Sequence, residues 1–148
     1  MKISVINGPN MNLLSIREPE HYGTESYEEL IDKIRAHCDK NGVEVEFFQS
    51  NHEGAIVDEI QKAYGRIDAI VINPAAYTHT SVAILDALRA VGIPAAEVHI
   101  SDIKSREPYR QISFVREYCE TVISGEGTDG YIKAIDYFIN KEKNKRKI

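Results

Sequence analysis

The stretch "KISVINGPNMN" at residues 2–12 decides the fold, because a short apolar run passes there directly into a polar turn. Residues 2–6 are rich in β-branched side chains and are followed at once by Asn7 and Gly8, which is the pattern of a buried strand and its end. Pro9 stiffens the turn that follows. We therefore expect the chain to begin with a strand that ends in a loop carrying asparagine side chains.

Four further runs along the chain also predict strands: "EVEFFQ" at 44–49, "AIVIN" at 69–73, "AAEVHI" at 95–100 and "TVIS" at 121–124. The segments between them change to a 3.6-residue apolar period, which predicts helices. The first helix has a capping box of Ser26 and Glu29 and stops at Asn41-Gly42.

The next helix is expected to end at Gly65 and to carry Tyr64 on its apolar stripe. A third is predicted to start near Thr78, with Val82 on its stripe, and the last to begin at residue 128 or 129. Each helix thus joins one strand to the next.

Strands that alternate with helices in this way favour a parallel sheet, because parallel neighbours need crossover connections that cover both faces. The predicted fold class is α/β, a flavodoxin-like doubly wound five-stranded parallel sheet in three layers, α/β/α. Nothing in the sequence divides the chain, so we expect a single domain over residues 1–148, with a lid loop at about 15–25 and a basic tail at 141–148.

Composition excludes several classes of partner. The chain has 148 residues, enough for an ordinary core, and a net charge of -5, which argues against nucleic acid and anionic membranes. It has no apolar run of about 18 residues and begins directly with "KISVING", so we expect a cytoplasmic protein. Cys38 and Cys119 lack any CxxC spacing and are predicted to be core thiols.

Polar residues collect immediately after the predicted strands. The first four strands exit into "NGPNMN", "QSNHEG", "NPAAYTHTS" and "EVHIS", the last of which leads on to "SREPYR". His52, His79 and His99 all lie at such exits. Ligands of open parallel sheets bind beyond the carboxyl ends of the strands, so these segments are expected to form one site.

Common kinds of site do not fit these segments. A phosphate-binding loop needs a glycine-rich turn, whereas "NGPNMN" has one glycine followed by proline. A receiver domain needs clustered aspartates where this chain has asparagines. Glu97 and His99 share a strand face but supply only two candidate ligands, so no metal is expected.

Five segments in order, "INGPNMNLLSIREPEHYG", "QSNHEG", "INPAAYTHTS", "EVHIS" and "SREPYR", closely resemble type II 3-dehydroquinate dehydratase. The resemblance runs from Lys2 to about Phe138. It implies a hydro-lyase that converts 3-dehydroquinate to 3-dehydroshikimate without a cofactor. Ser15 departs from the family, which has glycine there, and residues 113–127 are a looser match.

The resemblance assigns the chemistry to a few residues. Tyr22 as a phenolate would be a strong enough base to take the proton beside the ketone, and neighbouring guanidinium charge favours the phenolate. Arg17 is our first candidate for that charge, with Arg110 or Arg106 helping. Asn10 resembles the residue that helps to hold the enolate oxygen.

His99 matches the general acid that protonates the leaving hydroxyl, and Glu97 would fix its tautomer. Base and acid on opposite sides of the ring imply anti elimination. Substrate binding is implied for the remaining residues of the matching segments: Asn73 and the backbone amides of Ile100 and Ser101 for the carboxylate, His79 and Arg110 for the ring hydroxyls, and Arg106. The helix predicted to start near Thr78 would add its positive dipole.

Asp86 lies too far along its predicted helix to reach its own site, and in the family the matching aspartate reaches a neighbouring subunit. The resemblance therefore implies a homododecamer, a tetramer of trimers. Two alternatives remain. A Schiff-base dehydratase is disfavoured, because it would need a desolvated lysine and the lysines lie at strand starts, on helix faces, in one loop and in the tail, with none in the interior of a predicted strand. A catalytically silent flavodoxin-like binding module would tolerate changes at Arg17 and Tyr22.

Overall fold

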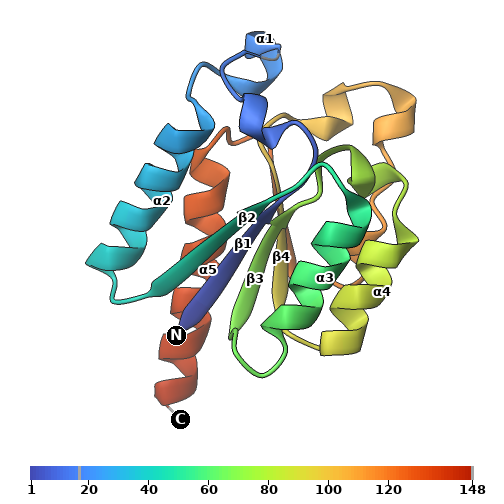
Figure 1. The fold of residues 1–148 in the computed structure, drawn as a ribbon. Helices are drawn as coiled ribbons and strands as arrows, with labels where there is room; N and C mark the ends of the chain where they lie inside the picture. Colours follow the sequence, from blue (N-terminus) through green and yellow to red (C-terminus); the bar gives the residue numbers. More distant parts are fainter. Residues whose placement is uncertain (17, 148) are drawn as a thin grey trace.

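Five parallel strands form the central sheet of the computed structural model, which describes residues 1–16 and 18–147. The order across the sheet is β2-β1-β3-β4-β5 (Figure 1). The strands are β1 (Lys2–Asn7), β2 (Glu44–Gln49), β3 (Ala69–Asn73), β4 (Ala95–His99) and β5 (Thr121–Ser124). The prediction of a flavodoxin-like, doubly wound parallel sheet is confirmed.

Four long helices cover the sheet, two on each face (Figure 1). One face carries α2 (Tyr27–Lys40) and α5 (Asp129–Arg146), and the other carries α3 (Glu53–Ala63) and α4 (Val82–Val91). Each face has its own apolar core. Leu30 and Ile135 lie fully buried in the first, and Ile60 and Leu88 in the second. The three-layer arrangement follows from these two cores.

Local signals in the sequence fix several boundaries. The predicted capping box is present at α2, where the Ser26 hydroxyl accepts a hydrogen bond from the Glu29 amide at 3.1 Å. The same helix ends just before Asn41-Gly42, and Gly42 takes the left-handed conformation that glycine favours. The last helix begins at Asp129, as the sequence predicted.

The third helix does not begin near Thr78, as we had expected. Residues Ala75–His79 form a separate 3-10 helix, η2, and α4 begins only at Val82 because the Ser81 hydroxyl accepts the Ile84 amide proton at 3.0 Å and caps the helix there. Val82 is consequently 49% exposed rather than part of the apolar stripe. The dipole of α4 therefore starts at Ser81.

The prediction that Tyr64 belongs to the apolar stripe of α3 was also wrong. It follows the last residue of α3 and is 71% exposed, because the helix ends at Ala63. Short elements that were not predicted follow β1 and β4: η1 (Met11–Leu13), α1 (Pro19–Tyr22), η3 (Ile103–Ser105) and η4 (Pro108–Arg110). One further short helix, η5 (Val115–Glu117), precedes β5. Of these, α1 lies within the segment predicted to be the lid.

The two cysteines pack as core thiols. Cys38 is fully buried and Cys119 is half-buried against the core, and burial raises the pKa of these thiols to about 11 and about 12. Over residues 1–16 and 18–147, no helix has the length and apolar character needed to cross a membrane.

Candidate active site

A pocket opens at the carboxyl ends of the strands, where the polar segments were predicted to meet. It holds about 400 Å³ of atom-free space. Most of the predicted site residues line it: Tyr22, Asn73, His79, His99, Ile100, Ser101, Arg106 and Arg110. Met11 and the alanines of η2 add an apolar wall. Segments far apart in the sequence thus converge on one cavity.

The base candidate Tyr22 lies at the end of α1 and meets Arg106 from the loop after β4. The Nη1 atom of Arg106 donates a hydrogen bond of 2.9 Å to the Tyr22 hydroxyl, and its guanidinium carbon lies 5.5 Å from the centre of the tyrosine ring. A guanidinium that cannot lose its charge thus lies in direct contact with the phenol. The sequence had placed Arg106 among the substrate-binding residues and only secondarily beside the base.

Arg106 is held firmly for a loop arginine, because only 4% of its side-chain surface is exposed. The same Nη1 atom donates to the Ser101 hydroxyl at 3.3 Å, and Nη2 lies 3.4 Å from the Glu18 carboxylate. Burial disfavours its charge, but the contacts with Tyr22, Glu107 and Glu18 outweigh burial and raise the pKa of Arg106. Arg106 therefore stays charged while it contacts the phenol.

His99 and Glu97 form a close pair at the end of β4. The ring Nε2 of His99 is hydrogen-bonded to the Glu97 carboxylate, and both side chains are buried. Because a carboxylate accepts, Nε2 carries the proton of this bond, and Nδ1 is the other nitrogen of the ring. Both side chains lie on the same face of β4, as the alternation of side chains along a strand predicted.

Asn73 is held from below by side chains of the core. Its amide nitrogen donates to the Tyr131 hydroxyl at 3.0 Å, and its amide oxygen accepts the Ala75 amide proton at 3.1 Å. Tyr131 in turn donates to the Asn7 amide oxygen at 2.5 Å. Burial raises the pKa of Tyr131, so it remains a hydroxyl donor. This buried network fixes the floor of the pocket.

Ile100 and Ser101 form a short buried connection between β4 and the loop that carries Arg106. The carbonyl of Ile100 accepts the Gly127 amide proton at 3.1 Å, and that of Ser101 accepts the Gly125 amide proton at 3.2 Å. These bonds fix the peptide planes at the edge of the pocket.

His79 ends η2 and lies half-buried at the pocket wall. Its Nδ1 lies 2.7 Å from the Ile112 carbonyl oxygen, which can only accept, so Nδ1 carries the proton. Desolvation by burial is the largest cause and lowers the pKa of His79, although the hydrogen bond to Ile112 opposes it. The neutral ring is therefore left with an unprotonated Nε2 for a ligand.

Not every predicted residue reaches the cavity. Asn10 is exposed, in a left-handed conformation, and its backbone amide donates to Asn51 at 3.0 Å. Asp86 is exposed on α4, away from the pocket of its own chain. Arg17 lies outside the described residues. Ser15 adopts a φ of 79°, a conformation that favours the glycine the family has there.

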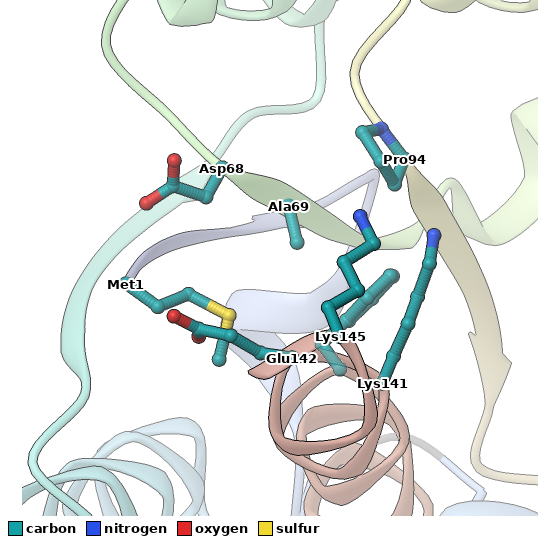
Figure 2. A pocket seen from close by; sticks show the side chains of 8 residues that line it. Met1, Asp68, Ala69, Pro94, Lys141, Glu142 and Lys145 are labelled. Atoms are coloured by element: carbon teal, nitrogen blue, oxygen red, sulfur yellow. The ribbon is translucent and has the colours of Figure 1, made fainter. Parts of the chain in front are cut away.

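A second hollow lies at the opposite end of the sheet (Figure 2). It holds about 680 Å³ of atom-free space between the start of β3 and the end of α5. Lys141 and Lys145 extend along it from α5, with Asp68 on the other side (Figure 2). It contains none of the residues predicted for the site. Within residues 1–16 and 18–147, no group of three histidine, cysteine, aspartate or glutamate side chains could hold a metal ion.

Three residues around the site were missed from the sequence. Tyr131 had been read only as part of an apolar helical stripe, which it also is. Ser113 and Arg116 contact the Glu97 carboxylate from a segment that matches the family loosely. A serine and an arginine in a loop give no signal of such contacts, because only the folded turn brings them to β4.

Known proteins of one family match this chain over most of its length. Residues 1–139 match the family model described as dehydroquinase class II. A 3-dehydroquinate dehydratase of Caldicellulosiruptor bescii is 54% identical over 135 residues, covering 90% of this chain and 93% of the relative. A protein of Aspergillus terreus called catabolic 3-dehydroquinase 1 is 52% identical, over 91% of this chain and 89% of the relative.

A solved structure shows the same relationship. The crystal structure of type II dehydroquinase from Butyrivibrio crossotus superimposes with a TM-score of 0.92 and is 54% identical in sequence. The match covers 95% of this chain and 97% of that one. The chain therefore belongs to the class II dehydroquinase family of enzymes.

Proposed function

We propose that this chain dehydrates 3-dehydroquinate to 3-dehydroshikimate, in the shikimate pathway, by anti elimination through an enolate. Family membership makes it an enzyme, a 3-dehydroquinate dehydratase of type II. The observation that best supports the detailed mechanism is the contact of Arg106 with the Tyr22 hydroxyl, in the same pocket as the paired His99 and Glu97.

Tyr22 acts as the base in this mechanism. Its phenolate takes the proton from the carbon beside the ketone, and the electron pair of that C–H bond moves onto the carbonyl oxygen as an enolate. Arg106 supplies the guanidinium charge that favours the phenolate. We assign Arg17 to the same task on the family resemblance. The exposed Asn10 is assigned to the enolate oxygen, which requires its loop to close over the substrate.

His99 acts as the acid. The enolate collapses, the bond from carbon to the leaving hydroxyl breaks, and a proton from the imidazolium joins that hydroxyl to form water. Because Nε2 faces Glu97, the proton transferred is the one on Nδ1. Glu97 holds the ring in this orientation throughout. The proton taken up by Tyr22 then returns through solvent to His99, which restores the starting state.

Binding is assigned to the rest of the pocket. Asn73 and the backbone amides of Ile100 and Ser101 take the substrate carboxylate, and His79 with Arg110 takes the ring hydroxyls. The neutral Nε2 of His79 suits a hydroxyl donor. Arg106, first assigned to the substrate, serves both the base and the substrate side of the pocket.

We also propose the assembly that the family resemblance implies. Asp86 lies on the exposed face of α4, outside its own pocket, and is assigned to the site of a neighbouring subunit within a trimer. Four trimers would form the dodecamer. We further propose that residues 1–148 act as one catalytic domain, that segment 15–25 is the lid, and that the protein is cytoplasmic.

Formation of the conjugated enone product can be followed by its ultraviolet absorbance. We expect purified protein to convert 3-dehydroquinate without added metal or cofactor, and to keep its activity after treatment with borohydride and substrate, because no lysine adduct forms. Arg17→Ala is expected to abolish turnover while substrate still binds. Absence of the enone from the wild-type reaction would disprove the proposed activity, and loss of activity with borohydride would disprove the mechanism.

A further inference from the structure

The buried carboxylate of Glu97 has two partners besides His99, and neither belongs to the site assigned above. Glu97 lies on β4 between β3 and β5, and its side chain is 0% exposed. The Ser113 hydroxyl lies 2.9 Å from both carboxylate oxygens, and Nη2 of Arg116 lies 3.8 Å from Oε2. Of these partners only Arg116 carries a charge that does not titrate.

The turn before η5 places both side chains against Glu97. The Arg116 backbone amide donates to the Ser113 hydroxyl oxygen at 3.3 Å, so the Ser113 proton is left to point at the carboxylate. Val115 between them is fully buried in the core and anchors the turn. The arginine side chain is 38% exposed, but its Nε atom is buried. Ser113 and Arg116 therefore approach Glu97 as one unit.

The charges explain what this unit does. While His99 is an imidazolium, it neutralises Glu97. When His99 gives up its proton, a buried carboxylate without another cation would be left uncompensated, which is costly in a protein interior. With Arg116 present, the pair left behind is neutral overall. The arginine therefore makes the proton of His99 easier to release.

We propose that Arg116, oriented together with Ser113, is a positioning residue of the dehydration, which keeps Glu97 ionised in both protonation states of His99. This inference rests on the proposed role of His99 as the acid. It assigns the loosely matching segment at 113–117 a part in catalysis, although none of its side chains lines the pocket.

The other titratable and charged groups near the pair are the same in wild type and in every Arg116 variant. Across the pocket lie His79, Arg106, Arg110 and Tyr22. Behind the pair lies Cys119, whose thiol stays protonated because burial, and then the charge of Glu97, raise its pKa to about 12. A change of pH dependence between variants of Arg116 is therefore assigned to Arg116 itself.

The experiment compares Arg116→Gln with wild type in two ways. The first is the pH profile of kcat, and the second is the titration of the His99 ring in the substrate-free enzyme, followed by NMR of ¹³Cε1-labelled histidine and assigned with His99→Asn. In Arg116→Gln we expect the alkaline limb of the profile and the His99 titration to move up by about one pH unit, and the plateau of kcat to fall roughly tenfold. Arg116→Lys keeps the charge and should restore both.

The matched control is Arg89→Gln, which removes an exposed arginine that pairs at 3.2 Å with Glu117 of the same η5 turn. It should leave the pH profile and the titration unchanged. Ser113→Ala removes a hydrogen bond but no charge, so it should lower kcat without moving the alkaline limb. A merely structural role for Arg116 would not move the His99 titration.

Should Arg116→Gln fail to fold, the double variant with Glu97→Gln is expected to fold, because it no longer buries an uncompensated carboxylate. In the double variant the Arg116 change should have no further effect on the His99 titration. A double variant that also fails to fold would overturn the inference.

An unchanged His99 titration in an active Arg116→Gln enzyme would overturn the inference as well. Failure of the wild type to dehydrate 3-dehydroquinate would instead overturn the proposed function. The NMR titration needs no turnover, so the two failures are distinguishable.

Discussion

The Tyr22 hydroxyl accepts a hydrogen bond of 2.9 Å from Arg106, a residue 84 positions later in the chain. The two residues come from the segments that follow β1 and β4, two strands separated by β3 in the sheet. Their contact joins the proposed lid to the loop beyond Ser101. The proposed base thus depends on a partner that only the folded sheet brings near.

Tyr22→Phe is expected to remove the base and little else. The ring can still pack at the pocket edge, so substrate affinity should change by less than about threefold, while kcat falls by at least a hundredfold, the usual contribution of general base catalysis. Steady-state kinetics with the ultraviolet assay, and calorimetry for binding, measure the two quantities. Tyr64→Phe, at an exposed tyrosine far from the pocket, serves as the control. Normal turnover by Tyr22→Phe would rule Tyr22 out as the base.

Arg106→Ala should lower kcat by about ten- to a thousandfold at neutral pH, because the phenolate loses an opposite charge within hydrogen-bonding distance. Raising the pH should recover part of the lost rate, since hydroxide then ionises the tyrosine instead. The comparison variant is Arg66→Ala, which breaks an exposed pair with Glu46 at the edge of the sheet. A pH-independent defect in Arg106→Ala would show that the arginine acts only on the substrate.

His79 is expected to make substrate binding depend on pH. Burial lowers its pKa from the ordinary value of about 6.5, so the ring is neutral above that pH and gains a proton on Nε2 only at lower pH. Protonation turns the acceptor into a donor, and KM should therefore rise only as the pH falls below that ordinary value. The same protonation favours the unfolded chain, so this contribution to stability is complete above about pH 6.5 and is lost below it.

The measurement is KM between pH 5 and 8 for wild type and His79→Gln, whose side chain does not titrate. The variant should bind more weakly and lose this part of the pH dependence. His37→Gln, at a surface pair with Asp136, should behave as wild type. An identical rise of KM in wild type and His79→Gln would assign the dependence to another group.

Gly8→Ala tests the close approach of the first and third strand exits. A Cβ atom at position 8 would lie 2.3 Å from the Pro74 carbonyl oxygen, in a turn where the Gly8 amide donates to the Asn73 carbonyl at 2.8 Å. Relief of such a clash moves backbone, so we expect the free energy of unfolding to fall by about 1–3 kcal/mol. Urea denaturation measures it.

Gly54→Ala is the matched control. Position 54 lies in α3 with open space around it, and alanine should there stabilise the protein by about 0.5–1 kcal/mol. Equal stability of Gly8→Ala and wild type would mean that the two strand exits separate at little cost.

Tyr131→Phe should weaken both stability and binding. Loss of the hydroxyl leaves buried amide groups of Asn7 and Asn73 without their partner, which costs about 1–3 kcal/mol of unfolding free energy. Asn73 also loses its orientation, so KM should rise more than kcat falls. Tyr137→Phe removes an exposed hydroxyl from the same helix and should change neither. If KM rises while the free energy of unfolding stays unchanged, the hydrogen bonds of Tyr131 do not stabilise the fold.

Most of the fold could be predicted because its signals are local. All five strands coincide with apolar runs, and the ends of α2 follow from Ser26 and Asn41-Gly42. The start of α4 was missed because η2 shares the helical period, and only the Ser81 cap separates the two. The exposure of Tyr64 was missed because periodicity continues past the point where the helix stops.

The location of the site could be predicted from the sequence, but most contacts between its side chains could not. Parallel strands put all their exits at one edge, so His79, His99 and Arg110 were expected near one another. Which arginine meets Tyr22 depends on the path of the loop through η3, and no sequence pattern specifies that path. The contacts of Ser113 and Arg116 with Glu97 could not be predicted for the same reason, because a turn before η5 brings these side chains to β4.

The proposed base Tyr22 and its guanidinium neighbour Arg106 lie on separate segments of the chain, α1 and the loop after β4. A shift of either segment would separate Tyr22 from Arg106 and break their hydrogen bond. Under the proposed mechanism, correct docking of both segments is therefore a condition for proton abstraction, even though only one of them carries the base.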